Sequence, residues 1–364
     1  MKFDKGRRDF IKKTVGAGIG VYSITQFGLP AIPIIGTAQA DTSNSSVVIV
    51  RDTRVIDSSF KIDPKVVSRM LEDAVKKLSG KRSASAAWKE YFRSDDIVGI
   101  KVNTLSGRWM SSRPELVAAI VDGLKSAGVK EKNMIIWDKA DRDLMSGGFK
   151  INTKSTDRPR CFGTNPSIGY EKDLKMYGTI ASRLSRIVPH CTAFVNVPVL
   201  KHHMMAGVTL SLKNWFGAIN NPNKYHFGMT DNNEKKMMAT CDYIPDLNAM
   251  LFSPSGLGKR QPLIVCDGIM AQYDQGPAYT PSKVWNYSGL IVSDDPVALD
   301  RVGVEIINSK RREAGLKALS EIGLEPGYIS IAADQFHKLG VDELSNIHLI
   351  SAGALTPGIG GVTS

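Results

Sequence analysis

DDIVGIKVN, at residues 95–103, is a short apolar run with polar residues at its end, which is typical of a buried β-strand. ELVAAIVDGLKSAG follows at residues 115–128. Its apolar residues recur at helical spacing between Pro114 and Gly128, which favour the start and the end of a helix. NMIIWDKA, at residues 133–140, then repeats the strand pattern. Strands and helices that alternate in this way predict an α/β protein with a largely parallel sheet.

The same alternation extends in both directions from this stretch. Strands are predicted by SVVIVRD at residues 46–52, AFVNVPVL at 193–200, PLIVCDG at 262–268 and SGLIVSDD at 288–295. Helices are predicted by KVVSRMLEDAVKKL at residues 65–78 and by the stretch that begins at Asp295-Pro296. No repeat and no low-complexity linker divides these elements. We therefore expect an α/β domain over residues 41–364, with a largely parallel sheet and flanking helices in one or two lobes.

The first 40 residues have the pattern of an export signal. GRRDFIK, at residues 6–12, is a twin-arginine pattern, and an uncharged run extends from residue 14 to residue 40. The run ends in AQA, a small-x-small cleavage site, and its glycines and prolines make it a poor membrane-spanning helix. We expect the twin-arginine translocase to export the folded protein to the periplasm, with cleavage after Ala40 and no membrane attachment afterwards. Retention of the leader as an anchor is the open alternative.

The net charge of the chain is +11, and the leader carries part of it. Residues 1–40 contain six Lys or Arg and two Asp, which is +4, so +7 remains for the rest of the chain. This remainder has neither a dense basic block nor interleaved aromatic residues, which argues against nucleic acid as a partner. A mildly basic surface instead favours a small anionic molecule.

The four cysteines, Cys161, Cys191, Cys241 and Cys266, are widely scattered and form no CxxC motif. Iron–sulfur clusters usually need closely spaced thiolates, and attached haem needs CxxCH, so the sequence predicts neither. Disulfides in an oxidising compartment and buried free thiols both remain open.

Polar residues follow several of the predicted strands. In open parallel sheets ligands bind outside the carboxyl ends of the strands, so Lys101, Asn103, Asp138 and Asp267 are candidate binding residues. The alternative is an ordinary polar turn or a helix cap. We favour the cap for Asp295, because Pro296 follows it at a predicted helix start, whereas both interpretations stay open for Lys101 and Asn103.

LKHHMMAGVTLSLKNW, at residues 200–215, gathers titratable groups in an otherwise apolar segment. Three of the six histidines, His202, His203 and His226, lie between positions 202 and 226. A lysine such as Lys213, when it is held among apolar neighbours, has a lowered pKa and becomes a usable nucleophile or base. Neutral imidazoles are common ligands of transition metals. The alternative is a loop in which the lysines face solvent and one histidine fills a gap.

The chain resembles the domain of unknown function 362 family over most of the part that follows the leader. The stretches that carry the resemblance are DDIVGIKVN, VPVLKHHMMAGVTLSLKNWFGAI with KYH after it, YIPDLNAML, PLIVCDG with the nearby DQGP, and SDDPVALD. Some members of the family carry an additional ferredoxin-like module with iron–sulfur clusters. This chain lacks the cysteine motifs of that module.

A more distant, local similarity is to nickel-dependent lactate racemase. In that enzyme a histidine precedes, by ten residues across an AG turn, the lysine that carries a nickel-pincer nucleotide, and a histidine further along helps to hold the metal. His203, Lys213 and His226 have this order here. The similarity implies proton transfer by His203, covalent attachment or nucleophilic attack at Lys213, and metal ligation by His226. Two details differ, because Ser211-Leu212 replaces a Gly-Gly-Arg run before Lys213 and the spacing to His226 is shorter.

Together these features predict an exported enzyme, dependent on a transition metal or an organometallic cofactor. It would act on a small anionic substrate by proton transfer or redox chemistry, as a racemase-like enzyme or an oxidoreductase. The expected site has His203 and Lys213 as catalytic residues, His226 and His202 as metal ligands, and a binding set of Lys101, Asn103, Asp138, Asn214 and Asp267. The alternative is a non-catalytic periplasmic accessory protein that binds a small anion or a metal.

Overall fold

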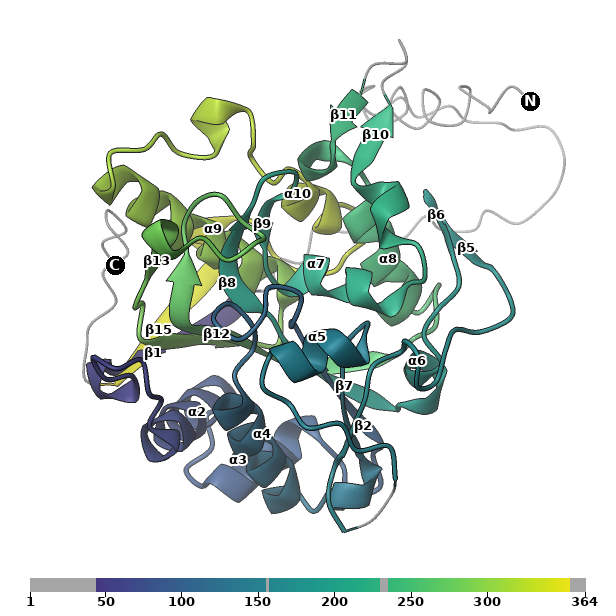
Figure 1. The fold of residues 1–364 in the computed structure, drawn as a ribbon, viewed down its shortest axis with the longest axis vertical. Coiled ribbons are helices and arrows are strands. Elements are labelled where there is room, and N and C mark those ends of the chain that lie inside the picture. The colour runs from purple at the N-terminus through teal and green to yellow at the C-terminus, as the bar shows by residue number, and fades with distance from the viewer. Residues whose placement is uncertain (1–43, 155–156, 230–234, 354–364) are drawn as a thin grey trace, which may run out of the picture. The chain divides into compact units, whose positions relative to one another are not determined.

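The computed structural model describes residues 44–154, 157–229 and 235–353 (Figure 1). The chain divides into two units, residues 1–41 and 42–364, and all described residues belong to the second. The predicted leader, residues 1–40, lies outside the described residues. Within the described part of the chain, no helix is both long enough and apolar enough to cross a membrane.

Within the described residues the main sheet has eleven strands. Eight of them form one path in the order β15-β1-β14-β12-β7-β2-β3-β4. Their bounds are β1 Ser45–Arg51, β2 Val98–Val102, β3 Met134–Trp137, β4 Arg160–Cys161, β7 Ala193–Val197, β12 Arg260–Gln272, β14 Gly289–Ser293 and β15 Ile347–Gly353. All neighbours from β12 to β4 pair in parallel, as do β1 and β15, whereas β14 runs antiparallel to β1 and to β12. The predicted α/β class with a largely parallel sheet is confirmed.

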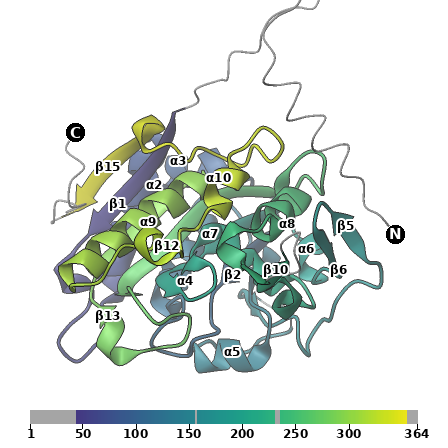
Figure 2. The ribbon, with the colours of Figure 1, turned by 90° about the horizontal axis from the view of Figure 1, so that it is seen from above.

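Helices cover both faces of this sheet (Figures 1 and 2). One face carries α2 Pro64–Ser79, α3 Ala84–Tyr91 and α4 Pro114–Ser126, and the other carries α7 Ser211–Asn214, α8 Tyr243–Phe252, α9 Pro296–Glu313 and α10 Tyr328–Ala332. The alternation of side chains along a strand explains how one strand serves both layers. In β1, Val47 and Ile49 enter the core below α9, whereas Val48 and Val50 enter the core below α2.

The remaining elements are short and lie mostly in the connections. They are α5 Asp141–Ser146, α6 Ile187–His190, β5 Lys175–Tyr177, β6 Ile180–Ser182, β8 Val199–His203, β9 Gly207–Thr209, β10 Phe227–Met229, β11 Lys235–Met237 and β13 Val284–Trp285. The 3₁₀ helices are η1 Thr53–Val55, η2 Glu131–Asn133, η3 Trp215–Ala218, η4 Pro222–Tyr225, η5 Met238–Thr240, η6 Pro281–Lys283, η7 Ser320–Ile322 and η8 Leu344–Asn346.

Strand β12 is long enough to pair with two successive strands along one edge. Its first part pairs with β7, with Ile264 opposite Asn196, and its second part pairs with β8, with Asp267 opposite Val199. Strand β8 then turns back into β9 through an antiparallel pairing. The strand end predicted at Asp267 is wrong, because β12 continues through that residue to Gln272.

Two other expectations have a clear outcome. The Asp295 side chain accepts hydrogen bonds from the backbone N–H groups of Val297 and Ala298, so the predicted cap of α9 is confirmed. All four cysteines fall within the described residues, are buried and take no part in a disulfide. Burial raises the pKa of the Cys161 and Cys191 thiols to about 12, which keeps them protonated.

Candidate functional site

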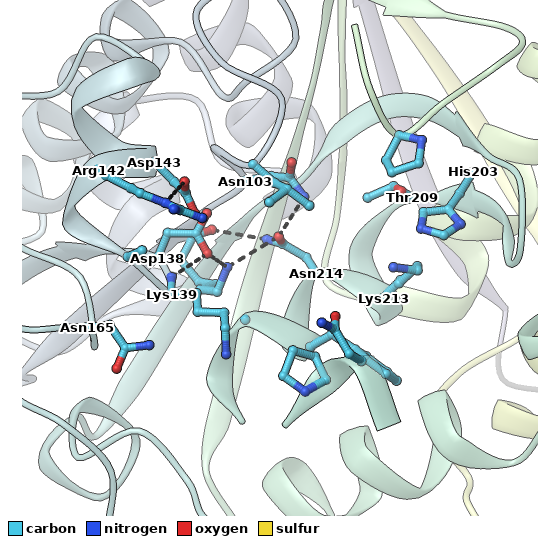
Figure 3. A pocket seen from close by; sticks show the side chains of 18 of the residues that line it. Asn103, Asp138, Lys139, Arg142, Asp143, Asn165, His203, Thr209, Lys213 and Asn214 are labelled. Atoms are coloured by element: carbon cyan, nitrogen blue, oxygen red, sulfur yellow. Dashed lines mark hydrogen bonds and ion pairs between the residues drawn. The ribbon is translucent and has the colours of Figure 1, made fainter. Parts of the chain in front are cut away.

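A cavity of about 620 Å³ opens at the carboxyl ends of β2, β3 and β8 (Figure 3). Seven of the nine predicted site residues line it, namely Lys101, Asn103, Asp138, His203, Lys213, Asn214 and His226. The strand-end rule explains this convergence, because parallel strands bring their carboxyl ends to one edge of the sheet. In Figure 3, His203, Thr209 and Lys213 lie on one side of Asn214, and Lys139, Arg142 and Asn165 lie on the other.

The floor of the cavity is formed by an ion pair between Lys101 and Asp138, both of which make further hydrogen bonds within the protein. Lys101 Nζ donates to Asp138 Oδ1 over 2.7 Å and to the carbonyl of Val102 over 2.6 Å. The backbone N–H and the hydroxyl of Thr104 donate to Asp138 Oδ2. Burial alone would raise the pKa of Asp138, but the charge and hydrogen bond of Lys101 outweigh it and lower that pKa. The amine of Lys101 and the carboxylate of Asp138 therefore have their hydrogen-bond partners within the protein. Their role in the cavity is structural.

The close approach of η3 to this pair depends on Gly217. A Cβ atom at this position would stand 2.9 Å from Lys101 Nζ and 2.8 Å from Asp138 Oδ1. Both distances are shorter than ordinary contacts, so a larger residue would displace the ion pair.

Lys201 is a second buried lysine, and the prediction of site residues omitted it. Its Nζ donates to Asn103 Oδ1 and Ser106 Oγ, each over 2.9 Å, and to the carbonyl of Met110 over 3.1 Å. Burial, and after it the charge of Lys213, lowers the pKa of Lys201 to about 7. The sequence held a signal for it, because alternate residues of a strand share a face and Lys201 stands two positions before His203.

Lys213 is buried, and its amine has no hydrogen-bond acceptor and no carboxylate partner among the described residues. Its Nζ lies 5.5 Å from the centre of the Phe216 ring. Burial lowers the pKa of Lys213 to about 8. The short helix α7 that carries it is fixed at its start by Asp300, whose carboxylate accepts the N–H groups of Ser211 and Leu212 over 2.7 and 3.1 Å. Lys213 therefore lies in the cavity wall on an anchored helix, and its amine is unpaired among the described residues.

His203 presents a hydrogen-bond donor to the cavity. Its Nδ1 accepts the backbone N–H groups of Met205 and Ala206 over 3.1 and 3.2 Å. Since an N–H group only donates, Nδ1 carries no hydrogen and the neutral ring bears its proton on Nε2. Burial, together with the charge of Lys213, lowers the pKa of His203 well below its ordinary value, so the ring is neutral.

His226 has the opposite arrangement. Its Nδ1 lies 3.1 Å from the carbonyl of Pro222, and because a carbonyl only accepts, Nδ1 bears the hydrogen. Nε2 of His226 is therefore left with a lone pair. Burial, and then the charge of Lys213, lowers the pKa of this histidine. The rings of His203 and His226 face each other at 5.9 Å and 31°, so a donor and an acceptor stand side by side in one wall.

The far side of the cavity adds further positive charge. Lys139 Nζ donates to Tyr170 Oη, and to the carbonyls of Ile219 and Asn220, over 3.2 to 3.3 Å. Arg142 is largely exposed and pairs with Asp143 over 3.2 Å. In all, five Lys or Arg side chains and two Asp side chains line the cavity, which leaves three positive charges in excess when every group is ionised. The electrostatics favour an anionic ligand.

Two predicted site residues do not reach the cavity, and both assignments are corrected. Asp267 is fully buried in mid-strand, where its carboxylate accepts from Arg113 Nη1 and from the Arg113 N–H over 2.9 Å. His202 neighbours His203 in β8, and successive side chains of a strand point to opposite faces. It lies outside the cavity lining, where its Nδ1 accepts the N–H of Gly276 over 3.1 Å. This contact holds the loop that contains Pro277, a residue of the cavity wall.

The donor set does not fit a metal ion held by protein side chains alone. No three His, Cys, Asp or Glu side chains within the described residues are grouped closely enough to hold one. His202 cannot join His226, because it lies behind β8, and Nε2 of His203 bears a hydrogen. The carboxylate of Asp138 is already occupied by Lys101 and Thr104.

Comparison with known proteins identifies the family of the chain but assigns it no activity. No curated protein matches the chain. A crystal structure of a Thermotoga maritima protein, solved by a structural genomics consortium, is similar at 12% identity with a TM-score of 0.37. The similarity covers 66% of this chain and 59% of that one. The family described as Domain of unknown function (DUF362) matches residues 98–305, which is more than half of the sequence. The chain belongs to the DUF362 family.

Proposed function

We propose that this protein is an enzyme that transfers a proton on a small anionic substrate bound in the cavity. The observation that carries the proposal is the unpaired amine of Lys213, which shares the cavity with two neutral histidines of opposite hydrogen-bonding character. Perturbed titratable groups that converge in a cavity are the usual mark of an active site.

The buried, unpaired charge of Lys213 favours an anion as the ligand. An ammonium group that lacks a partner is costly to hold in a buried position, and an anionic group beside it would offset that cost. The excess of cations around the cavity supports the same class of ligand.

The two histidines can divide the work of a proton transfer. His226 has the lone pair on Nε2 that a general base needs, and its lowered pKa keeps it unprotonated at neutral pH. His203 offers a fixed N–H to the oxygen on which negative charge develops when the substrate loses its proton. The ammonium of Lys213 stabilises the same charge. This division differs from the roles that the similarity to lactate racemase implied, in which His203 transferred the proton and His226 was a metal ligand.

Isotope exchange tests the proposal directly. Small 2-hydroxy and 2-oxo acids are incubated with the full chain in D₂O, and the loss of their C–H signals is followed by NMR. We expect exchange that disappears in His226→Gln while binding, measured by calorimetry, remains. His348→Gln, an exposed histidine on β15, is the matched control and keeps the activity. Binding without exchange in the unaltered protein would contradict the proposed enzyme activity and support the alternative, a non-catalytic binding protein.

Export through the twin-arginine route is the second part of the proposal. The pattern at residues 6–12 and the AQA site support it. Fractionation of cells that carry the full chain should recover protein that begins at Asp41 in the periplasm. Replacement of both Arg7 and Arg8 by Lys should leave the uncleaved chain in the cytoplasm, and equal export of this variant would rule out the twin-arginine route.

A further inference from the structure

Lys213 differs from the other lysines of the cavity in what its amine contacts. Lys101, Lys139 and Lys201 each donate to three acceptors, so their amines are held by the protein. The amine of Lys213 donates to none of the described residues. Once the Lys213 amine loses a proton, its lone pair is therefore free to attack a bound ligand. The amines of the other three lysines are each surrounded by protein acceptors, which leaves their lone pairs no open position for such an attack.

We propose that Lys213 forms an iminium with the carbonyl carbon of an oxo acid bound in the cavity. This inference rests on the proposed function and narrows its substrate class from small anions in general to anions that also carry a ketone or an aldehyde. A lysine amine is the side chain that forms Schiff bases with carbonyl substrates, and an apolar, buried setting is what activates it.

The surroundings of Lys213 supply the remaining requirements. Phe216 covers one side of the amine, and Thr209, whose buried hydroxyl has no hydrogen-bond partner among the described residues, lines the same cavity. The lowered pKa of about 8 leaves a fraction of the amine unprotonated at neutral pH. His226 lines the same cavity as Lys213, and in the proposed step it accepts the proton that the ammonium must lose.

The step balances with the groups present. The ammonium of Lys213 gives one proton to Nε2 of His226, and the free amine forms a C–N bond to the carbonyl carbon as the C–O π pair moves to oxygen. A second proton passes from nitrogen to that oxygen and gives the carbinolamine. The imidazolium of His226 then returns its proton to the hydroxyl, which leaves as water while the nitrogen lone pair forms the C=N bond. The products are the iminium and one water, and His226 is neutral again.

This intermediate would also explain why proton transfer is feasible at the site. The iminium draws electrons from the adjacent C–H bond, so the regenerated base His226 can remove that proton and leave an enamine. His203 stays a hydrogen-bond donor throughout, which agrees with its fixed tautomer.

Reductive trapping tests the inference. Pyruvate or 2-oxoglutarate is added to the full chain with sodium borohydride, which reduces an iminium to a stable secondary amine, and peptide mapping locates the adduct. We expect a mass increase equal to the oxo acid minus one oxygen, on Lys213. Below pH 8 its initial rate should rise about tenfold per pH unit, following the free amine. Lys213→Arg should abolish the adduct, whereas Lys224→Arg, an exposed lysine nearby, should leave it unchanged.

The outcomes separate the two proposals, and the decisive map is made on the unaltered chain, so it does not depend on whether a variant folds. An adduct spread over exposed lysines, with Lys213 unmodified, overturns the inference. Proton exchange that requires His226 but gives no adduct on Lys213 overturns the iminium and leaves the proton-transfer enzyme. An adduct on Lys213 without proton exchange supports the iminium and rejects the exchange activity.

Discussion

Replacement of Lys213 by Met should stabilise the protein, and the size of the gain follows from the structure. The pKa of Lys213 falls from 10.5 to about 8 because folding removes its amine from water, and no partner among the described residues compensates for this. At about 1.4 kcal/mol per pKa unit, holding the charged amine in the folded state costs roughly 3 kcal/mol. Methionine has a similar length and no charge, so Lys213→Met should raise the free energy of unfolding by up to about that amount.

The pH dependence of the gain is the sharper part of this prediction. Below pH 8 the amine of Lys213 is charged in both the folded and the unfolded chain, so the full cost is present. Between pH 8 and 10.5 the folded chain loses the proton first, the unfolded chain binds more protons, and the cost is relieved as pH rises. Above 10.5 both forms are neutral and the cost vanishes. The advantage of Lys213→Met should therefore be greatest near pH 6 and small near pH 10.

Urea denaturation at a series of pH values measures the effect, with the midpoint and slope taken from each curve. Lys224→Met, at an exposed position, is the matched control and should change the free energy of unfolding by less than about 0.5 kcal/mol at every pH. A loss of stability for Lys213→Met at pH 6, or a gain that does not shrink toward pH 10, would falsify the account of Lys213 as a buried, unpaired charge.

Three further predictions concern the surroundings of the site. Arg113→Met should lower the free energy of unfolding, measured by urea denaturation, by about 3 kcal/mol, because it leaves the buried Asp267 without its ion pair. The affinity for small anions should stay unchanged, since both residues have a structural role. Gly217→Ala should cost about 1–3 kcal/mol, since its Cβ would press on the ion pair of the cavity floor, and a neutral effect would contradict the close approach of η3. The rate of proton exchange should fall only below pH 6.5, because burial and the charge of Lys213 lower the pKa of His226. A rate that already falls to half its maximum above pH 6.5 would contradict His226 as the base.

The fold was predictable where its cause is local. Runs of β-branched and aliphatic residues predicted β1, β2, β3, β7, β12 and β14, because such runs fit a sheet that is covered on both faces. The cap at Asp295 was predictable for the same reason, since an acceptor, a proline and an apolar helix follow one another in the sequence.

The errors at the site arise where alternation or strand length decides the outcome. The strand predicted over residues 193–200 stops before Lys201, His202 and His203, but β8 continues through all three. Because successive side chains of a strand point to opposite faces, His202 lies on the face away from the cavity, whereas Lys201 lines the cavity. Asp267 looked like a strand end, yet the pairing of β12 with β8 extends the strand beyond it. Such pairings join residues far apart in the sequence, as Arg113 and Asp267 show, and no local pattern encodes them.

Two separate segments of the chain supply most of the charged and imidazole groups around the cavity. Lys201, His203, Lys213 and His226 all belong to residues 199–226, from β8 to the residue after η4, whereas Lys139 and Arg142 come from the connection after β3. Under the proposed function, residues 199–226 hold the groups that react with the ligand, whereas part of the positive charge that attracts it comes from the connection after β3. A change confined to residues 199–226 would alter the reactive groups and leave Lys139 and Arg142 in place, so the chemistry of the cavity could change while part of its attraction for anions remained.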